Sequence, residues 1–160
     1  MKFSISAGKA NDRVVIKGAV EDGADQELNE MLKEAKATAL VLDCKELHRI
    51  NSIGVSLWIA AFERARPKRA LTLENCSTVF IHYLNMLPQF GCGGRVVSFH
   101  VPYRCQNAKC RADAELLFKA EGLAVDSELG PKPCPACKGS MEPSVEVEDY
   151  LGFLAHQKPD

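Results

Sequence analysis

The stretch from Ala39 to Arg64 constrains the fold of this chain more than any other part of the sequence. It opens with a continuous apolar run over residues 39–42, which ends at Asp43. Such a run is typical of a strand that is buried on both faces of a sheet. A polar turn is predicted over Lys45–Asn51, with a helix after it. Four apolar residues recur at positions i, i+3, i+4 and i+7 and so share one face of that helix: Val55, Trp58, Ile59 and Phe62.

The segments on either side continue this alternation of strands and helices. A hairpin is predicted from residues 2–6 and 14–20, and a helix over residues 24–37. The central helix is expected to end at Arg66-Pro67. After it the pattern gives a strand at 70–73, a helix from Cys76 or Ser77 to Leu87, and a last strand at 95–101. This order predicts the α/β class, with a mostly parallel sheet and helices packed against it.

The joint between the central strand and its helix reads Asn51-Ser52-Ile53-Gly54-Val55. Asn51 and Ser52 both favour the N-terminal cap of a helix. In open α/β sheets, ligands and partners dock at this carboxyl edge of the strands. A strand, a short loop, the sequence Asp-Ser-Ser/Thr-Gly-Leu and an apolar helix form the signature of the STAS domain, the fold of bacterial anti-sigma factor antagonists. Residues 1–98 resemble that domain in this motif and in the order of their elements.

The resemblance implies a function for this joint. Ser52 matches the serine that kinase-type anti-sigma factors phosphorylate in the STAS family, which makes it the candidate phosphoacceptor. Gly54 matches the motif glycine, whereas Asn51 replaces the usual aspartate and Ile53 the usual hydroxyl residue. These residues, Asn51 to Gly54, would bind a protein partner such as an anti-sigma factor kinase or another signalling protein. Without the resemblance, capping alone explains a serine at a helix start.

Four cysteines in the second half of the chain give the most specific chemical signal. Cys105-x4-Cys110 and Cys134-x2-Cys137 are two pairs of closely spaced thiols. Zinc takes four tetrahedral ligands, and these spacings let one turn of backbone present two sulfurs. Residues 99–142 are therefore predicted to form a zinc-ribbon-like module around one structural zinc, with all four thiolates as ligands.

The residues around these thiols refine the prediction. Gly139 is expected to let the backbone turn sharply, so that N–H groups face a thiolate. His100 and Cys92 are the substitutes if one thiol is not a ligand. The Cys134-x2-Cys137 motif also has a redox interpretation, in which the two thiols cycle as a disulfide. Pro133 before the motif disfavours the helix that such redox motifs usually open.

Charge does not favour nucleic acid as a partner. The chain has 20 Lys and Arg residues against 21 Asp and Glu residues, and residues 99–142 carry six of each. A neutral ribbon is a poor phosphate binder. A nucleic-acid-associated regulator and a thiol redox protein are therefore the alternatives to the main hypothesis, a protein-interaction module with a structural zinc.

Length and composition limit the remaining possibilities. The 160 residues allow one domain and a small module, assigned as residues 1–98 and 99–142, with a C-terminal tail at 143–160. Apolar residues near Tyr150 are expected to pack that tail on one of the two modules, although a docking peptide is the alternative. No apolar run reaches the ~20 residues that span a bilayer, and no signal peptide is visible. A cytoplasmic location is expected, where seven cysteines do not indicate disulfides.

The sequence also bears on catalysis and on assembly. No nucleophile, base and orienting group occur together at a plausible spacing, so the chain is predicted not to be an enzyme. A dimer is compatible with the sequence, which does not decide the oligomeric state.

Overall fold

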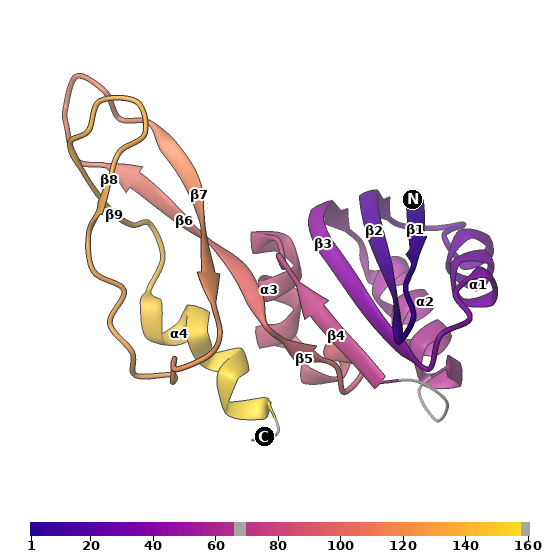
Figure 1. Ribbon diagram of the computed structural model, residues 1–160. Coiled ribbons are helices and arrows are strands. Elements are labelled where there is room, and N and C mark those ends of the chain that lie inside the picture. The colour runs from indigo at the N-terminus through magenta and orange to yellow at the C-terminus, as the bar shows by residue number, and fades with distance from the viewer. Residues whose placement is uncertain (66–69, 158–160) are drawn as a thin grey trace.

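The computed structural model describes residues 1–65 and 70–157, and it contains two sheets (Figure 1). The first sheet has the strand order β1-β2-β3-β4-β5. Its strands are β1 (Lys2–Ala7), β2 (Asn11–Val20), β3 (Ala39–Ile50), β4 (Ala70–Glu74) and β5 (Arg95–Val96). β1 pairs with β2 in antiparallel fashion, and the other neighbours are parallel. The predicted α/β class with a mostly parallel sheet is confirmed.

Helices separate the strands in the predicted order. They are α1 (Asp25–Glu34), α2 (Ser52–Ala65), α3 (Thr78–Met86) and the short 3-10 helix η2 (Pro88–Gly91). α1 and α2 lie side by side, whereas α3 lies between the first and the second sheet (Figure 1). The predicted stop at Arg66-Pro67 lies outside the described residues. No helix within residues 1–65 and 70–157 is long and apolar enough to cross a membrane.

An aromatic cluster fixes α2 against α3 and η2. The ring of Trp58 lies 4.5 Å from that of Phe62, 5.8 Å from that of Phe80 and 5.4 Å from that of Phe90, measured between centroids. Trp58 also donates a hydrogen bond of 3.0 Å from Nε1 to the carbonyl oxygen of Phe90. Burying an indole requires such a partner for its N–H, so Trp58 sets the position of α2 on the core.

The polar turn predicted over Lys45–Asn51 is wrong, because β3 continues through it to Ile50. Leu47 and Ile50 are buried within this extension, while the polar residues between them are exposed. The extension pairs with the long strand β2 up to Val20↔Ile50, with register shifts on the way. Pairing with β2 gives the backbone N–H and C=O groups of this segment hydrogen-bond partners that a turn would not provide. The carboxyl end of β3 therefore lies directly before α2.

The single last strand predicted at 95–101 is also wrong, because this segment belongs to two sheets. β5 ends at Val96, and β6 (Ser98–Cys105) begins the second sheet. Between the two strands, the N–H of Val97 donates to the carbonyl oxygen of Leu73 at 2.9 Å. Within β6, the N–H of His100 donates to the carbonyl oxygen of Cys76 at 2.8 Å. The chain therefore passes from the first sheet into the second through a single residue, Val97, whose N–H is hydrogen-bonded.

The second sheet is antiparallel, with the order β7-β6-β9-β8. It contains β6, β7 (Asp113–Lys119), β8 (Lys132–Pro133) and β9 (Ser140–Pro143), and we call residues 98–143 the ribbon. Sequence reasoning missed β7, although Ala114, Leu116 and Phe118 alternate along it. These three side chains are half-buried, and the intervening ones are exposed. The alternation is the usual mark of a strand with one solvated face.

The C-terminal segment packs back on both parts of the molecule, and we call residues 144–157 the strap. It contains α4 (Val147–Leu151) and η3 (Gly152–His156). Tyr150 donates from its hydroxyl to the carbonyl oxygen of His100 at 2.6 Å, and Asn85 of α3 donates to the carbonyl oxygen of Tyr150 at 2.9 Å. Phe153 meets Phe99 edge to face at 5.1 Å. The tail therefore packs, as its apolar residues predicted, and it contacts both parts.

Candidate functional site

The start of α2 has a definite capping geometry. The Asn51 side-chain oxygen accepts a hydrogen bond of 2.7 Å from the N–H of Gly54, and the Asn51 carbonyl oxygen accepts one of 2.9 Å from the N–H of Val55. Asn51 is therefore the N-cap, and Ser52 is the first residue of the helix. An amide can cap a helix as well as a carboxylate can. Asn51 therefore caps this helix as an aspartate at the same position could.

Gly54 has a packing reason to be glycine. A Cβ at this position would lie 2.0 Å from the carbonyl oxygen of Val20, at the end of β2. No side chain fits there unless the helix start moves away from the sheet. The motif glycine is therefore explained by the close approach of α2 to β2.

The α2 start, comprising Asn51, Ser52, Ile53 and Gly54, presents two of its side chains to solvent. Ser52 is exposed, and Ile53 is 48% exposed although it is a large apolar residue. Farther along α2, Val55, Trp58 and Phe62 are buried as predicted, and Ile59 is half-buried. The helix therefore turns its apolar face to the core and its first turn outward.

The four predicted ligands converge at the far end of the ribbon. The sulfur atoms of Cys105, Cys110, Cys134 and Cys137 all lie within 4.8 Å of one another. The Sγ–Sγ distance is 3.5 Å between Cys105 and Cys137, and 3.9 Å between Cys110 and Cys134. A tetrahedral site with Zn–S bonds of about 2.3 Å has sulfur–sulfur edges of about 3.8 Å. We call this set the four-thiol cluster, and its spacing fits a tetrahedral metal ion.

Two similar backbone turns present the thiols. The N–H of Cys105 donates to the carbonyl oxygen of Ala112 at 2.9 Å, and that of Cys134 donates to Gly139 at 2.7 Å. Each bond joins the first cysteine of a pair to the second residue after the other cysteine. The two extra residues of the first pair are taken up by a turn in which the N–H of Cys110 donates to the carbonyl oxygen of Asn107 at 2.9 Å. The longer spacer is thus compatible with the same turn.

The role predicted for Gly139 is partly wrong. The left-handed residue of this turn is Lys138, with φ of 62°, and Arg111 has the same position and a φ of 48° in the other turn. Gly139 instead clears the sulfur of Cys137, which a Cβ would approach to 3.2 Å. Its N–H donates to that sulfur at 3.4 Å. The glycine therefore lets the backbone come close enough to hydrogen-bond a thiolate, as the sequence indicated, but it does not make the turn.

Backbone hydrogen bonds lower the pKa values of the Cys105 and Cys134 thiols, whereas burial raises them. Backbone N–H groups, that of Cys137 foremost, lower the pKa of the Cys134 thiol to about 7. The N–H of Asn107 lowers the pKa of Cys105, but burial and the neighbouring sulfurs outweigh it and raise that pKa to about 12. A divalent cation resolves this conflict, because coordinated thiols lose their protons. The donor set therefore suits a thiolate-binding metal such as zinc.

The other cysteines and histidines do not join this cluster. Cys92 is buried, and its sulfur lies 3.4 Å from the carbonyl oxygen of Phe90. His100 is buried in β6, where its Nδ1 has no hydrogen-bond partner among the described residues. Neither residue lies with the four sulfur atoms of the cluster. The structure therefore does not support Cys92 or His100 as a substitute ligand.

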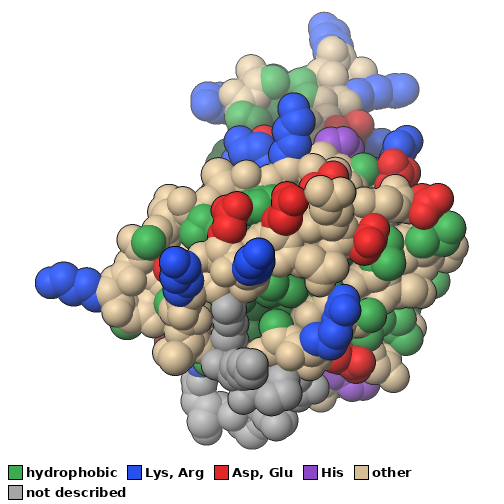
Figure 2. Space-filling model, turned by 90° about the vertical axis from the view of Figure 1, so that its right-hand side faces the viewer, with side chains coloured by type: hydrophobic (Ala, Val, Ile, Leu, Met, Phe, Trp, Pro, Cys, Tyr) green, Lys and Arg blue, Asp and Glu red, His purple; other side chains and the backbone are tan. Residues whose placement is uncertain are grey.

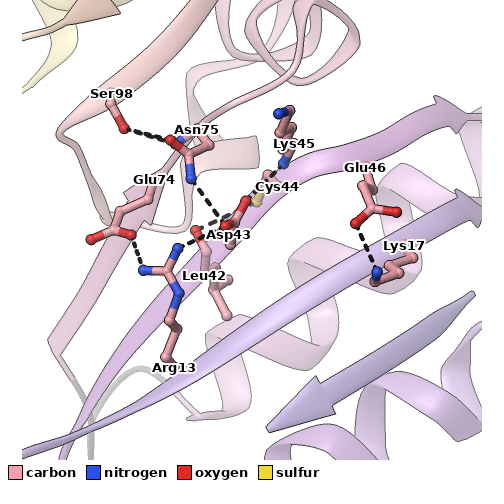
Figure 3. Close-up of polar contacts among 10 residues, drawn as sticks. All are labelled: Arg13, Lys17, Leu42, Asp43, Cys44, Lys45, Glu46, Glu74, Asn75 and Ser98. Atoms are coloured by element: carbon pink, nitrogen blue, oxygen red, sulfur yellow. Dashed lines mark hydrogen bonds and ion pairs between the residues drawn. The ribbon is translucent and has the colours of Figure 1, made fainter. Parts of the chain in front are cut away.

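One polar cluster was not found from the sequence (Figure 3). Arg13 of β2 is paired with Asp43 of β3 at 2.7 Å and with Glu74 of β4. The side-chain amide of Asn75 donates a hydrogen bond of 3.0 Å to Asp43. The backbone N–H of Asn75 donates one of 2.8 Å to the hydroxyl of Ser98. The available signal was an acidic residue after each apolar segment, Asp43 after residues 39–42 and Glu74 at the end of β4. Because these groups pair with one another, the cluster links three strands to the start of the ribbon.

The comparisons with known proteins give little beyond this description. No protein-family model matches the chain, and no curated protein matches it. Among solved structures, the chain is similar to the anti-sigma factor antagonist SpoIIAA in its unphosphorylated form, with 14% identity and a TM-score of 0.44. That similarity covers 56% of this chain and 83% of the other. The fold assignment rests on the strand order and register of this chain itself.

Proposed function

We propose that this protein is a non-enzymatic interaction module that binds a partner protein through the α2 start. The observation that carries the proposal is the exposure of Ile53 beside the exposed Ser52, on a turn that the Asn51 cap and the close approach of Gly54 place against the sheet. An exposed large apolar side chain next to a hydroxyl gives a partner both buried area and a hydrogen bond. The motif resemblance to anti-sigma factor antagonists points to a signalling protein, such as an anti-sigma factor kinase, as the partner.

The position of Ser52 would make such binding sensitive to phosphorylation. A phosphate adds about −1.5 to −2 charges at neutral pH, and the first N–H groups of a helix have no partner within it. The fold would tolerate the charge because it lies at the favourable end of the dipole. A partner packed over Ser52 and Ile53 would have to desolvate that charge. Phosphorylation would therefore act on binding and leave folding unchanged.

The ribbon contributes a structural zinc in this proposal, with Cys105, Cys110, Cys134 and Cys137 as its ligands. A ribbon this small has little core of its own, so bound metal would supply much of its folding free energy. The division into residues 1–98, 99–142 and 143–160 belongs to the same proposal.

Charge at the ribbon end argues against nucleic acid as the partner. Lys and Arg side chains gather at the top of Figure 2. The exposed Lys109, Arg111 and Lys138 are sequence neighbours of the cluster cysteines. Four thiolates around one divalent zinc carry a net charge of about −2, because each coordinated thiol is deprotonated. Since these charges largely cancel, the ribbon end is a weak binder of phosphates.

The test compares Ser52→Asp with Ser56→Asp, a matched control that adds the same charge one helical turn later on the exposed side of α2. Each variant and the wild type would be used to capture partners from cell extract, with identification by mass spectrometry and thermal unfolding measured in parallel. We expect Ser52→Asp to lose a partner that wild type and Ser56→Asp both retain, without a fall in unfolding temperature. Equal capture by all three proteins would contradict the proposal.

A further inference from the structure

The strap lies between two grooves that the functions proposed above do not use. The first has a volume of about 800 Å³ and lies between α3, the end of β3 and the strap. The second has a volume of about 600 Å³ and lies between residues 125–131 and the strap. Val145 and Glu146 line both grooves. We call the pair the strap grooves, and together they form one surface with the strap as its central ridge.

Apolar side chains supply much of the lining of both grooves. Val79 and Met86 of α3 line the first, and Met86 is 65% exposed. Leu129 and Val147 line the second. An apolar cleft on a protein surface favours the burial of apolar groups from a ligand or a partner.

The charged groups of the strap grooves are almost all of one sign. Six exposed carboxylates line them: Asp126, Glu128, Glu142, Glu146, Glu148 and Asp149. None of these side chains has an ion pair or hydrogen bond within residues 1–65 and 70–157. Arg49 is the one Lys or Arg among the lining residues, and it already pairs with Glu21 at 2.8 Å. The surface therefore carries negative charge that the described chain does not neutralise.

The second groove shows this combination most clearly. Five of the six carboxylates line it, and no Lys, Arg or His does. In the strap itself, Val145 and Val147 alternate with Glu146 and Glu148, so apolar and acidic side chains are interleaved along one short segment. A partner that fills the groove must supply apolar groups and cations at similar spacing, because unpaired carboxylates are costly to desolvate.

We propose that the strap grooves bind a partner segment that contains both apolar residues and Lys or Arg. The apolar floor would take the partner's aliphatic side chains, and the carboxylate rim would pair with its cations. This surface is distinct from the α2 start, and its occupant is fixed by charge complementarity together with the apolar lining.

The probe is a short fluorescent peptide of alternating Lys and Leu residues, measured by fluorescence anisotropy with the metal-loaded full chain. A Glu/Leu peptide of the same length controls for apolar content, and a Lys/Ser peptide controls for charge. We expect only the Lys/Leu peptide to bind well. We expect the triple variant Glu142→Gln, Glu146→Gln, Glu148→Gln to weaken that binding about tenfold or more, since each lost ion pair removes part of the attraction.

The matched control variant is Asp22→Asn, Glu34→Gln, Glu63→Gln, which removes the same number of exposed carboxylates away from the grooves. It should bind the Lys/Leu peptide like wild type, and so should Ser52→Asp. If the triple variant does not fold, Glu146→Gln alone, at the position shared by both grooves, serves in its place. Unchanged affinity in the groove variant, equal loss in the control variant, or equally tight binding of the Lys/Ser peptide would overturn the proposal.

Discussion

At the scale of single residues, the α2 start separates residues with packing roles from residues that only the proposed binding would use. Asn51 caps the helix and Gly54 lets it approach β2, so both have structural reasons to be where they are. Ser52 and Ile53 have no such role in the described contacts of their side chains, and both are exposed. The proposed partner surface therefore consists mainly of the two residues in the middle of the motif.

Gly54→Ala should destabilise the protein strongly. A Cβ placed 2.0 Å from the carbonyl oxygen of Val20 forces the start of α2 off the sheet. Overpacking of this kind costs about 1–3 kcal/mol, and we expect the upper part of that range because the clash is with backbone. Urea unfolding measures the change. Gly130→Ala is the control, since a Cβ there meets nothing within 4 Å, and a loss no larger than in this control would show that the packing account is wrong.

At the scale of elements, the strap packs along the junction between the two sheets, where β5 is followed by β6. Its Tyr150 bonds to β6, its Phe153 packs on Phe99, and Gln157 accepts a hydrogen bond of 3.0 Å from the N–H of Val96 in β5. Short helical segments of this length are not stable alone. The strap is therefore held by these tertiary contacts.

Tyr150→Phe should cost about 0.5–1.5 kcal/mol near neutral pH, because it removes one hydrogen bond. Burial, the main cause, raises the pKa of Tyr150 above its ordinary value of 10.0. The folded state then holds the phenolic proton more tightly than the unfolded state. The hydroxyl's contribution is therefore complete below pH 10 and is lost as pH rises above it.

Urea unfolding of wild type and Tyr150→Phe at neutral pH and above pH 10 checks this sign. The gap in unfolding free energy between the two proteins should narrow as pH rises. Tyr103, whose pKa burial also raises, is present in both proteins and cancels in the comparison. A gap that stays constant or widens above pH 10 would refute the role given to the Tyr150 hydroxyl.

At the scale of the whole molecule, the four-thiol cluster stands at the far end of the ribbon, away from the first sheet (Figure 1). The ribbon still shares buried contacts with the rest, since Phe99 and Val101 of β6 belong to the same apolar core as the first sheet. Loss of the metal should therefore destabilise first the turns that hold the thiols, and then the strap that packs on β6.

Purified protein should carry one zinc per chain, and Cys137→Ser should lose it. Amide hydrogen exchange should then speed up across residues 103–142 and the strap, while β1 to β4 stay protected, because metal binding supplies folding free energy only locally. Cys92→Ser is the control that should keep its zinc. Elemental analysis that finds no zinc in protein purified without chelator, or loss of zinc from Cys92→Ser, would contradict the assigned ligand set.

The sequence by itself determined the features that depend on local pattern. The apolar run before Asp43 and the periodicity of Val55, Trp58 and Phe62 predicted the α/β order. The two cysteine pairs predicted which sulfurs meet, because ligand spacing is a property of short segments. These features are present in the structure.

Tertiary contacts decided the rest. β3 runs to Ile50 through polar residues because β2 offers it a partner. Residues 95–101 divide between two sheets because Arg95 and Val96 pair with β4, whereas the residues from Ser98 on pair with β7. The strap grooves exist only because distant segments, α3, residues 125–131 and the strap, come together. The sequence pattern of a strand does not specify which strand it pairs with, because the same alternation of residues suits many neighbours. Long-range pairing therefore could not be predicted from the sequence.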